Sequence, residues 1–582
     1  MNLKRFLAIA VLSLMSFQGY ASHLLGGEIV WKCKPNGKYQ FTLVLYRECG
    51  GITLPTSAQS LATNAGVSIS CAFISTTDVV PSCYTGTTTC AGATSGTGKM
   101  QKYVYRSGDI TLTGTPPASG WYFTWTSCCR PSSITNVVSP GGASYLLRAI
   151  MYPYTPPGST SPLSAGTSAN PTCFDSSPNF LEDPQVISCT GVDVVYNNLG
   201  YDPDLDSLYY NWSYPWDASS FSANPSTNSV NFVSGYTWNS PLPSGSTSTP
   251  ASIDGETGEV TFNSGVAGSW ATCVVIEEWR CGQKVGEIYR DIPIVTLSCT
   301  PPTGLCSSAF VDEAPDMSLT PDNSLMNATV LTPVTNASGD TIYYYTEVFP
   351  GDTVRFKITA SDAYPNPNCS SQNIQFSASG GNLSSAANYG NANACLFNPP
   401  CATLTSLNPG GVFTYPGLND AQFNWNITCD HLFYQEYQCG TLKSEYSFYL
   451  RMQDDQCPIN RFSYKKVVVK VKNYMPGMPN IDNTCIQQDD LGVTFDWVAN
   501  PDTGFNWDFY VINHIDTLGN TTVVDTIYDW ATQSYTHTGA DPNAVNGYTI
   551  QVGGGCGLLS DPTPVLQNIR VDLQAFPPPP NS

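Results

Sequence analysis

Charged residues are scarce in this sequence, and positive charge is the scarcer sign. Only 12% of the 582 residues are charged, and 24 Lys and Arg stand against 45 Asp and Glu, for a formal net charge of -21. An acidic surface repels phosphate backbones and anionic lipid, so we expect no nucleic-acid partner. The same surface favours divalent cations, basic partners or neutral polymers such as glycans.

Catalytic signatures are missing as well. The sequence contains no GxSxG, no HExxH and no phosphate-binding glycine loop, and it has no CxxC pair for zinc. Its few histidines are scattered along the chain: His23, His431, His514 and His537. A glycosidase needs two carboxylates that flank one bond, but neighbours such as Glu277 and Glu278 point to opposite faces of a strand. The sequence therefore predicts a protein that is not an enzyme.

Long apolar segments are missing beyond the N-terminus. Lys4 and Arg5 precede an apolar run over residues 6–17, and Ala21 then provides a small side chain before Ser22. This order is typical of a secretory signal peptide over residues 1–21, cleaved near Ala21. The run is too short to cross a bilayer core of about 30 Å. We therefore predict a secreted chain without a membrane span.

Cysteine, by contrast, is plentiful, with 21 residues. An exported chain meets an oxidising environment, so we expect disulfide bonds, and the odd count leaves at least one thiol unpaired or bonded to another molecule. Cys128 and Cys129 are adjacent and can bond to each other, although alternation along a strand favours separate partners. Spacing leaves the connectivity open. Pairs that lie close enough in sequence to staple a loop are Cys83 and Cys90, Cys273 and Cys281, Cys395 and Cys401, and Cys429 and Cys439.

Helical periodicity is absent after the signal peptide, and short alternating segments take its place. Residues 39–46 (YQFTLVLY) place Tyr39, Phe41, Leu43 and Leu45 on one side, and residues 354–358, 446–452 and 466–471 alternate in the same way. The 48 Gly and 44 Pro residues provide many turns between such segments. This pattern predicts an all-β fold of tandem, Ig-like β-sandwich domains held by disulfides.

Turn-rich linkers divide the chain into units. Breaks rich in Pro, Gly, Ser and Thr lie at residues 153–171, 299–304 and 475–480. In the last unit, residues 493–497 and 507–512 are predicted to be early strands, with Trp497 and Tyr510 in the core. Tyr548 is a candidate tyrosine-corner residue, and a bond between Cys485 and Cys556 could close the unit. The predicted units are an N-terminal β domain (22–155), a linker (156–170), a β-sandwich (171–298), a second β-sandwich (305–473), a fibronectin type III-like domain (476–574) and a polyproline tail (575–582).

Several ordered motifs carry a family resemblance. They are residues 22–29 (SHLLGGEI), Cys33, residues 39–49 (YQFTLVLYREC), residues 202–208 (DPDLDSL), residues 253–260 (IDGETGEV), residues 277–280 (EEWR) and residues 286–292. Together they resemble the large surface proteins of Bacteroidota that carry a gliding-motility-associated C-terminal sorting domain and leave the cell by type IX secretion. The resemblance spans residues 22–475. It implies display on the bacterial cell surface, PKD-like or cadherin-like domains, the secretion machinery as a partner, and no catalytic residues. The chain departs from the family in ending at the polyproline tail, where a sorting module is expected.

The acidic segment 202–206 (DPDLD) is the best candidate binding site. Carboxylates at alternating positions, Asp202, Asp204 and Asp206, can converge on Ca²⁺, which takes six to eight oxygen ligands. The segment resembles the DPDGD calcium motif of cadherin-like repeats, with Leu205 where Gly is usual. Glu277 and Glu278 are candidates for further ligands, and the matching set in the next unit is Asp362, Asp454 and Asp455. The alternative interpretation is a solvated acidic turn shaped by Pro203.

Two functions are compatible with these features. The first is a structural or adhesive protein of the cell surface, stiffened by calcium and linked to gliding or attachment, with a protein or glycan ligand. The alternative is a carbohydrate-binding component of a polysaccharide-handling system. For the alternative, the aromatic runs at residues 121–125 and 209–212 are candidates to stack on sugar rings, although alternating aromatics are also typical of strand cores.

Overall fold

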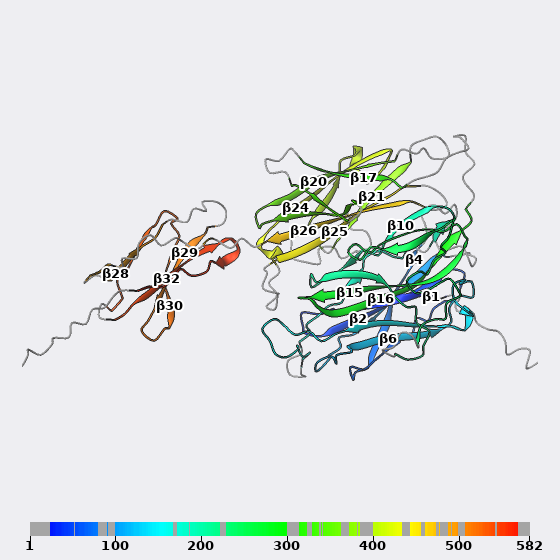
Figure 1. Ribbon diagram of the computed structural model, residues 1–582, viewed down its shortest axis with the longest axis horizontal. Coiled ribbons are helices and arrows are strands. Elements are labelled where there is room, and N and C mark those ends of the chain that lie inside the picture. Colours follow the sequence, from blue (N-terminus) through cyan, green and yellow to red (C-terminus); the bar gives the residue numbers. More distant parts are fainter. Residues whose placement is uncertain are drawn as a thin grey trace, which may run out of the picture.

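The computed structural model consists of β-strands, turns and short 3-10 helices in the part of the chain that it describes (Figure 1). This part is residues 24–567 without 52, 80–89, 91–98, 167–171, 185–186, 222–227, 300–313, 323–328, 337–338, 340, 363–371, 381, 385–399, 433–442, 456–459, 473–476, 478–486, 490–491, 499–506 and 542–543. The predicted signal peptide and polyproline tail lie outside the described residues. The all-β prediction is confirmed.

The first structural unit, which we call the N-terminal body, covers residues 24–299. Its main sheet runs in the order β1-β2-β5-β4-β3-β6-β7-β16-β15-β12, β9 pairs with β16, and a contact between β1 and β16 closes the ring. The strands of this sheet are β1 (Leu24–Cys33), β2 (Tyr39–Glu48), β3 (Gln59–Thr63), β4 (Ile69–Val79), β5 (Met100–Ser107), β6 (Trp121–Cys128), β7 (Ser144–Met151), β9 (Ile187–Cys189), β12 (Ser207–Trp212), β15 (Gly268–Arg280) and β16 (Gln283–Leu297).

Smaller sheets complete this body. β10 (Asp193–Asn197), β14 (Glu259–Asn263) and β13 (Thr249–Ile253) form one, and β8 (Asn179–Phe180) pairs with β11 (Gly200–Tyr201). Alternating aromatics such as Trp31, Phe41 and Phe123 fill the interior of the main sheet. Tyr196, Trp212 and Phe262 form a separate core between the smaller sheet and the long strands. Because apolar side chains alternate along each strand, each sheet can contribute one face to a core.

The predicted boundary between residues 22–155 and 171–298 is corrected by this sheet. β16 pairs with both β1 and β7, with Gly27 opposite Asp291 and Ile150 opposite Glu287. Ala165, inside the predicted linker, is only 3% exposed and packs in the main core. The physical reason is that β15 and β16 are buried along almost their whole length, so both faces need cover from other strands.

Two of the motifs that carry the family resemblance, residues 22–29 and 286–292, meet where β1 pairs with β16. Gly26 has a φ of 142°, and a Cβ built there would lie 1.7 Å from the Asp291 carbonyl oxygen, so only glycine fits. Beside it, Glu28 accepts from Arg290 Nε at 2.5 Å, and both side chains are buried. A second buried pair joins Arg130 to Asp291 at 2.6 Å. These motif residues therefore hold the fold together.

The second unit, the middle sandwich, covers residues 316–472. One sheet has the order β17-β20-β24-β22 and the other β18-β19-β26-β25-β21-β23. Phe356, Phe423, Trp425 and Phe448 pack between them, as the alternation of residues 354–358 and 446–452 predicts. The strands are β17 (Asp316–Pro321), β18 (Thr332–Thr335), β19 (Thr341–Val348), β20 (Thr353–Ser361), β21 (Asn373–Ser379), β22 (Thr403–Ser406), β23 (Thr414–Pro416), β24 (Leu418–Asn426), β25 (Lys443–Gln453) and β26 (Phe462–Lys472).

The third unit, the C-terminal sandwich, covers residues 487–567 and lies to one side of the other two (Figure 1). Trp497 and Tyr510 are buried in its core, as the sequence predicts. Tyr548 is buried there too, but its hydroxyl contacts the His537 ring at Nδ1 (2.9 Å) rather than the backbone group that a tyrosine corner requires. Its sheets have the orders β27-β28-β31 and β30-β29-β32-β33, with β34 beside β32. The strands are β27 (Gln487–Asp489), β28 (Gly492–Asp496), β29 (Phe509–Ile515), β30 (Thr521–Ile527), β31 (Ser534–His537), β32 (Gly547–Gly554), β33 (Leu558–Leu559) and β34 (Leu566–Gln567).

The disulfides differ from the pairs suggested by sequence proximity. Cys90 bonds to Cys49 and not to Cys83. Cys429 bonds to Cys556 and not to Cys439. Because Cys556 is already bonded, the suggested bond between Cys485 and Cys556 is excluded as well. Cys273 is free and buried, so it does not pair with Cys281. Further bonds join Cys33 to Cys173, Cys189 to Cys299 and Cys128 to its neighbour Cys129. Cys395, the suggested partner of Cys401, lies outside the described residues. The three-dimensional fold, which sequence spacing does not reveal, decides most of these pairings, and the bond between Cys128 and Cys129 differs from the separate partners that strand alternation favours.

The N-terminal body and the middle sandwich share a buried junction. Leu181 and Leu199 from the first pack with Tyr449 and Tyr464 from the second. Arg451 of β25 pairs with Glu182 at 3.1 Å, and both side chains are at least nine-tenths buried. The Tyr449 hydroxyl donates to the Gly200 carbonyl at 3.1 Å. An apolar centre with a buried ion pair is typical of a stable contact between domains.

Candidate metal centre

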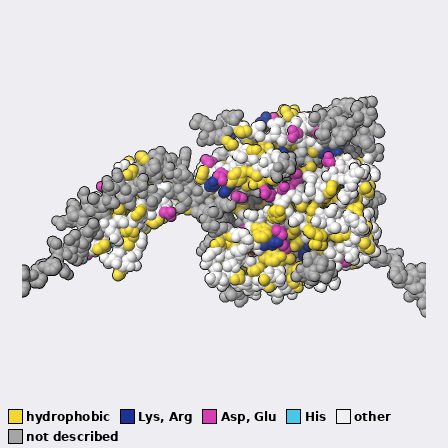
Figure 2. Space-filling model, viewed as in Figure 1, with side chains coloured by type: hydrophobic (Ala, Val, Ile, Leu, Met, Phe, Trp, Pro, Cys, Tyr) yellow, Lys and Arg dark blue, Asp and Glu magenta, His cyan; other side chains and the backbone are white. Residues whose placement is uncertain are grey.

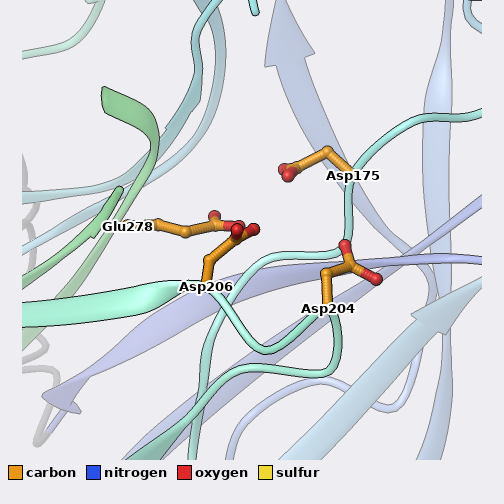
Figure 3. Close-up of side chains that lie close together, drawn as sticks. All are labelled: Asp175, Asp204, Asp206 and Glu278. Atoms are coloured by element: carbon orange, nitrogen blue, oxygen red, sulfur yellow. The ribbon is translucent and has the colours of Figure 1, made fainter. Parts of the chain in front are cut away.

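Four carboxylates of the N-terminal body converge on one point (Figure 3). Asp175, Asp204, Asp206 and Glu278 each offer an oxygen atom within 4.8 Å of the others. We call this group the acidic cluster. Three separate segments supply it: the chain before β8, the turn between β11 and β12, and the end of β15.

The turn at residues 202–206 is shaped by Asp202. Its Oδ1 accepts hydrogen bonds from the backbone N–H of Asp204 at 2.8 Å and of Asp206 at 3.0 Å. Leu205 adopts a φ of 62°, so the position where the calcium motif has Gly does take the left-handed conformation that favours glycine. Asp202 Oδ2 is buried with no hydrogen-bond partner among the described residues. Asp202 therefore folds the turn and leaves one oxygen beside the acidic cluster.

Strand alternation separates the two predicted glutamates. Glu278 and Arg280 lie on the face of β15 that meets the turn, whereas Glu277 lies on the other face. Glu277 accepts from Lys284 at 2.5 Å and from the Trp279 indole N–H at 3.2 Å. Glu278 thus joins the acidic cluster, and Glu277 is outside it.

Arg280 is the cation of this site. Its Nε donates to both oxygens of Asp206 at 2.9 Å, its Nη2 to Asp175 at 3.0 Å, and its Nη1 to the Phe174 carbonyl at 2.9 Å. The Cys33–Cys173 disulfide anchors the segment that carries Asp175 to β1. One guanidinium therefore faces Asp202 and the four carboxylates of the acidic cluster, which leaves excess negative charge.

Burial makes this excess negative charge energetically unfavourable. Burial, reinforced by neighbouring carboxylates, raises the pKa of Asp175 to about 7 and the pKa of Asp204 to about 6. The same cause holds the pKa values of Asp202 and Glu278 well above their usual range. Glu278 is fully buried, and neither of its carboxylate oxygens has a hydrogen-bond partner among the described residues. The acidic cluster must therefore hold protons or a further cation to be stable.

The corresponding residues of the middle sandwich do not gather in this way. Asp454 Oδ1 accepts from the Arg461 backbone N–H at 2.8 Å, and Asp455 accepts from the Asn373 backbone N–H at 3.0 Å. Asp362 follows β20, and its own N–H donates to Gly417 at 3.2 Å. Within the described residues, the acidic cluster is the group whose carboxylates reach metal-binding spacing.

Sequence reasoning missed Asp175 and Arg280. Arg280 stands two residues after Glu278, so period-two alternation could have placed both on one face of the strand. Asp175 lies in an irregular segment outside any motif, and only the three-dimensional pairing of β8 with β11 brings it to the turn.

The aromatic runs are mostly core. Trp121 and Trp125 are at most 9% exposed, and Tyr210 and Trp212 are buried as well. Tyr209, between the last two, is 47% exposed. The sugar-stacking alternative therefore finds little support in these two runs.

Comparisons with known proteins return distant likenesses. No protein-family model matches the sequence, and no curated protein matches it either. Among solved structures, the chain is similar to domains A168–A170 of titin at 10% identity and a TM-score of 0.17, covering 67% of this chain and 98% of that one. It is also similar to the FN1–FN3 domains of chicken CNTN1 at 9% identity and a TM-score of 0.16, covering 66% and 95%. The CupB2 chaperone of Pseudomonas aeruginosa matches at 12% identity and a TM-score of 0.12, covering 38% and 96%.

These likenesses are too weak for an argument about relationship or function. What stands is the architecture itself, a chain of disulfide-bearing β units with Ig-like sandwiches. Among the described residues, no helix combines the length and apolar character needed to cross a bilayer.

Proposed function

We propose that the chain is a secreted structural or adhesive protein of the bacterial surface, in which the acidic cluster binds Ca²⁺. The observation that carries the calcium site is Glu278, a fully buried carboxylate aimed into the acidic cluster without a hydrogen-bond partner in the described structure. The export-type N-terminus, the disulfides and the surface-protein motifs support the location. Linkage to gliding or attachment rests on the family resemblance.

The ligand chemistry favours calcium among common metal ions. Every candidate ligand atom in the acidic cluster is a carboxylate oxygen, and no histidine or cysteine belongs to it. Hard oxygen ligands select Ca²⁺ or Mg²⁺ over Zn²⁺ and copper. Carboxylates from three separate segments give an irregular ligand set, which Ca²⁺ tolerates and Mg²⁺, with its strict octahedral geometry, does not.

The site is placed to stiffen the chain. Leu205, in the centre of the acidic turn, packs against the core of the middle sandwich. Gly200, at the start of the same connection, accepts the hydrogen bond from Tyr449 of that sandwich. A cation that fixes the turn would therefore also fix the surface on which the middle sandwich is seated.

Calcium titration of the full chain tests the proposal. Isothermal calorimetry on chelator-treated protein should show uptake of calcium, and Asp204→Asn should weaken it at least about tenfold because one charged ligand is lost. Asp254→Asn is the matched control, since Asp254 also shapes an acidic turn by accepting from Glu256 and Thr257 but lies outside the acidic cluster. No calcium uptake by the wild-type chain would show that the turn is only structural.

Location is tested separately. Fractionation of the native host should find the chain at the cell surface or in the medium, and deletion should reduce attachment to a solid support. Recovery of the chain inside the cell would contradict this part of the proposal.

A further inference from the structure

A polar groove lies between the N-terminal body and the middle sandwich. It has a volume of about 230 Å³, and residues 200–208 form one wall. The opposite side is the outer face of β19, β25 and β26, where Tyr343, Tyr345, Glu445, Tyr449 and Lys466 line it. Figure 2 shows acidic side chains along the boundary between the upper and lower units on the visible face.

Strand alternation explains why aromatic and polar side chains meet there. On β25, Tyr446, Phe448 and Leu450 point into the core, so Glu445, Ser447 and Tyr449 point out. Register then aligns neighbours across the sheet. Tyr345 lies beside Val468, Val468 lies opposite Ser447, and Tyr449 lies opposite Lys466. The groove floor is therefore a rigid sheet face on which the rings of Tyr343 and Tyr345 are partly exposed, whereas Tyr449 is buried in the junction.

We propose that this groove binds one unit of a neutral glycan. A sugar ring has an apolar C–H face, which the electron-rich face of a tyrosine attracts, and hydroxyl edges that need hydrogen-bond partners. Tyr345 supplies a half-buried ring whose hydroxyl is held by Glu347 at 2.7 Å, so its orientation is fixed before binding. Ser207, Glu256, Asn382 and Glu445 supply polar groups around it. Such a pattern of a few polar groups among aromatic side chains is typical of small-ligand sites.

A cation of the chain itself already occupies the aromatic side of the groove. Lys466 Nζ already lies 5.8 Å from the ring centroids of both Tyr343 and Tyr449, and it donates to the Glu256 carbonyl at 2.8 Å. Cationic side chains seek such ring faces, and here a residue of the chain takes that position. Asp206, at the other wall, is paired with Arg280. A second cation would compete with Lys466 for these ring faces. The hydroxyl groups of a sugar would instead find acceptors in the carboxylates of Asp202, Glu256 and Glu445, which also line the groove.

The size of the groove limits the ligand. Small-molecule pockets usually begin at about 300 Å³, so this groove is suited to a single ring, with the rest of a polymer extending along the junction. Such a site would also give an adhesive surface protein a defined partner. The inference goes beyond calcium binding, because the tyrosines of the groove belong to the middle sandwich and not to the acidic cluster.

A glycan array with the full chain, followed by calorimetry on the best neutral oligosaccharide, tests the inference. Tyr345→Ala should weaken binding at least about tenfold, whereas Tyr345→Phe, which keeps the ring, should stay within about threefold of wild type. Tyr528→Ala is the matched control, because Tyr528 is 74% exposed in the C-terminal sandwich and far from the groove in sequence and fold. Unchanged thermal unfolding of each variant would show that the fold is intact.

Three results would overturn the inference: no neutral glycan retained, equal binding by wild type and Tyr345→Ala, or preference for a basic peptide. Failure of the calcium proposal is distinguishable, because Glu278 belongs to the acidic cluster and does not line the groove. If Glu278→Gln still binds glycan, the groove stands whether or not calcium binds.

Discussion

Replacement of Glu278 by Gln should make the metal-free protein more stable while removing its response to calcium. Glu278 is fully buried, and burial together with the neighbouring carboxylates holds its pKa well above the ordinary range of a glutamate. Folding of the metal-free protein must therefore either bury this negative charge or neutralise it with a proton, and both cost free energy.

Glutamine has nearly the same shape and needs no proton. We therefore expect Glu278→Gln to raise the free energy of unfolding of the N-terminal body by about 1–2 kcal/mol in EDTA, or a few degrees in Tm. Calcium should stabilise the wild type by about 3 kcal/mol at a hundredfold excess over Kd and should leave Glu278→Gln unmoved. Scanning calorimetry in EDTA and in CaCl₂ measures both effects.

Glu277→Gln is the internal control for this experiment. Glu277 is the neighbour on the other face of β15, where it accepts from Lys284, so its replacement should keep the calcium response and cost little. The reasoning is refuted if Glu278→Gln lowers Tm in EDTA as much as Glu277→Gln does, since that would make Glu278 an ordinary satisfied core residue.

Four further predictions concern the pH dependence of the acidic cluster, the junction between the units and the turn at Leu205. Calcium affinity should fall as pH drops from 8 to 5, by up to about tenfold per pH unit for each proton that calcium displaces. The reason is that Asp175 and Asp204 take up protons as the pH passes their pKa values of about 7 and about 6. A calorimetric Kd that does not change with pH would contradict this prediction. Without calcium the same two groups should make stability fall as pH rises between about 4 and 7, since the folded state holds more protons there. Arg451→Ala should weaken the junction by about 3–5 kcal/mol, because it leaves the buried Glu182 carboxylate without its ion-pair partner. The measurement is faster amide hydrogen exchange at Leu199. As a control, Lys357→Ala, which removes a half-exposed ion pair with Asp420, should cost at most about 1 kcal/mol. Leu205→Val should be less stable than Leu205→Gly by about 1–3 kcal/mol, because a β-branched residue tolerates the positive φ worst, and equal unfolding midpoints would rule that out.

Local patterns predicted the strands well. The alternation of residues 446–452 and 466–471 falls inside β25 and β26, and Trp497 and Tyr510 are core residues as expected. These successes depend only on period-two burial, which a single strand encodes by itself.

Contacts between distant segments could not be predicted in the same way. No residue near Gly27 in sequence indicates its pairing with Asp291, so the composition of the linker predicts a domain boundary inside a continuous sheet. The acidic turn was found because its carboxylates alternate within five residues, but Asp175 and Arg280 join it through the fold. Alternation could have removed Glu277 from the ligand set, since a strand cannot aim adjacent side chains at one ion.

The disulfide between Cys429 and Cys556 changes how the chain would carry tension. It joins residues that are 127 positions apart. Cys429 lies just after β24 in the middle sandwich, and Cys556 lies just after β32 in the C-terminal sandwich. A pull on the C-terminus would pass from Cys556 directly to Cys429 and bypass β25, β26 and most of the C-terminal sandwich. About 400 Å of extended chain lies within this disulfide loop, and tension could draw it out only after the bond is reduced and the strands inside the loop unfold. Under shear on a surface, the oxidised protein would act as a short tether and the reduced protein as a long one.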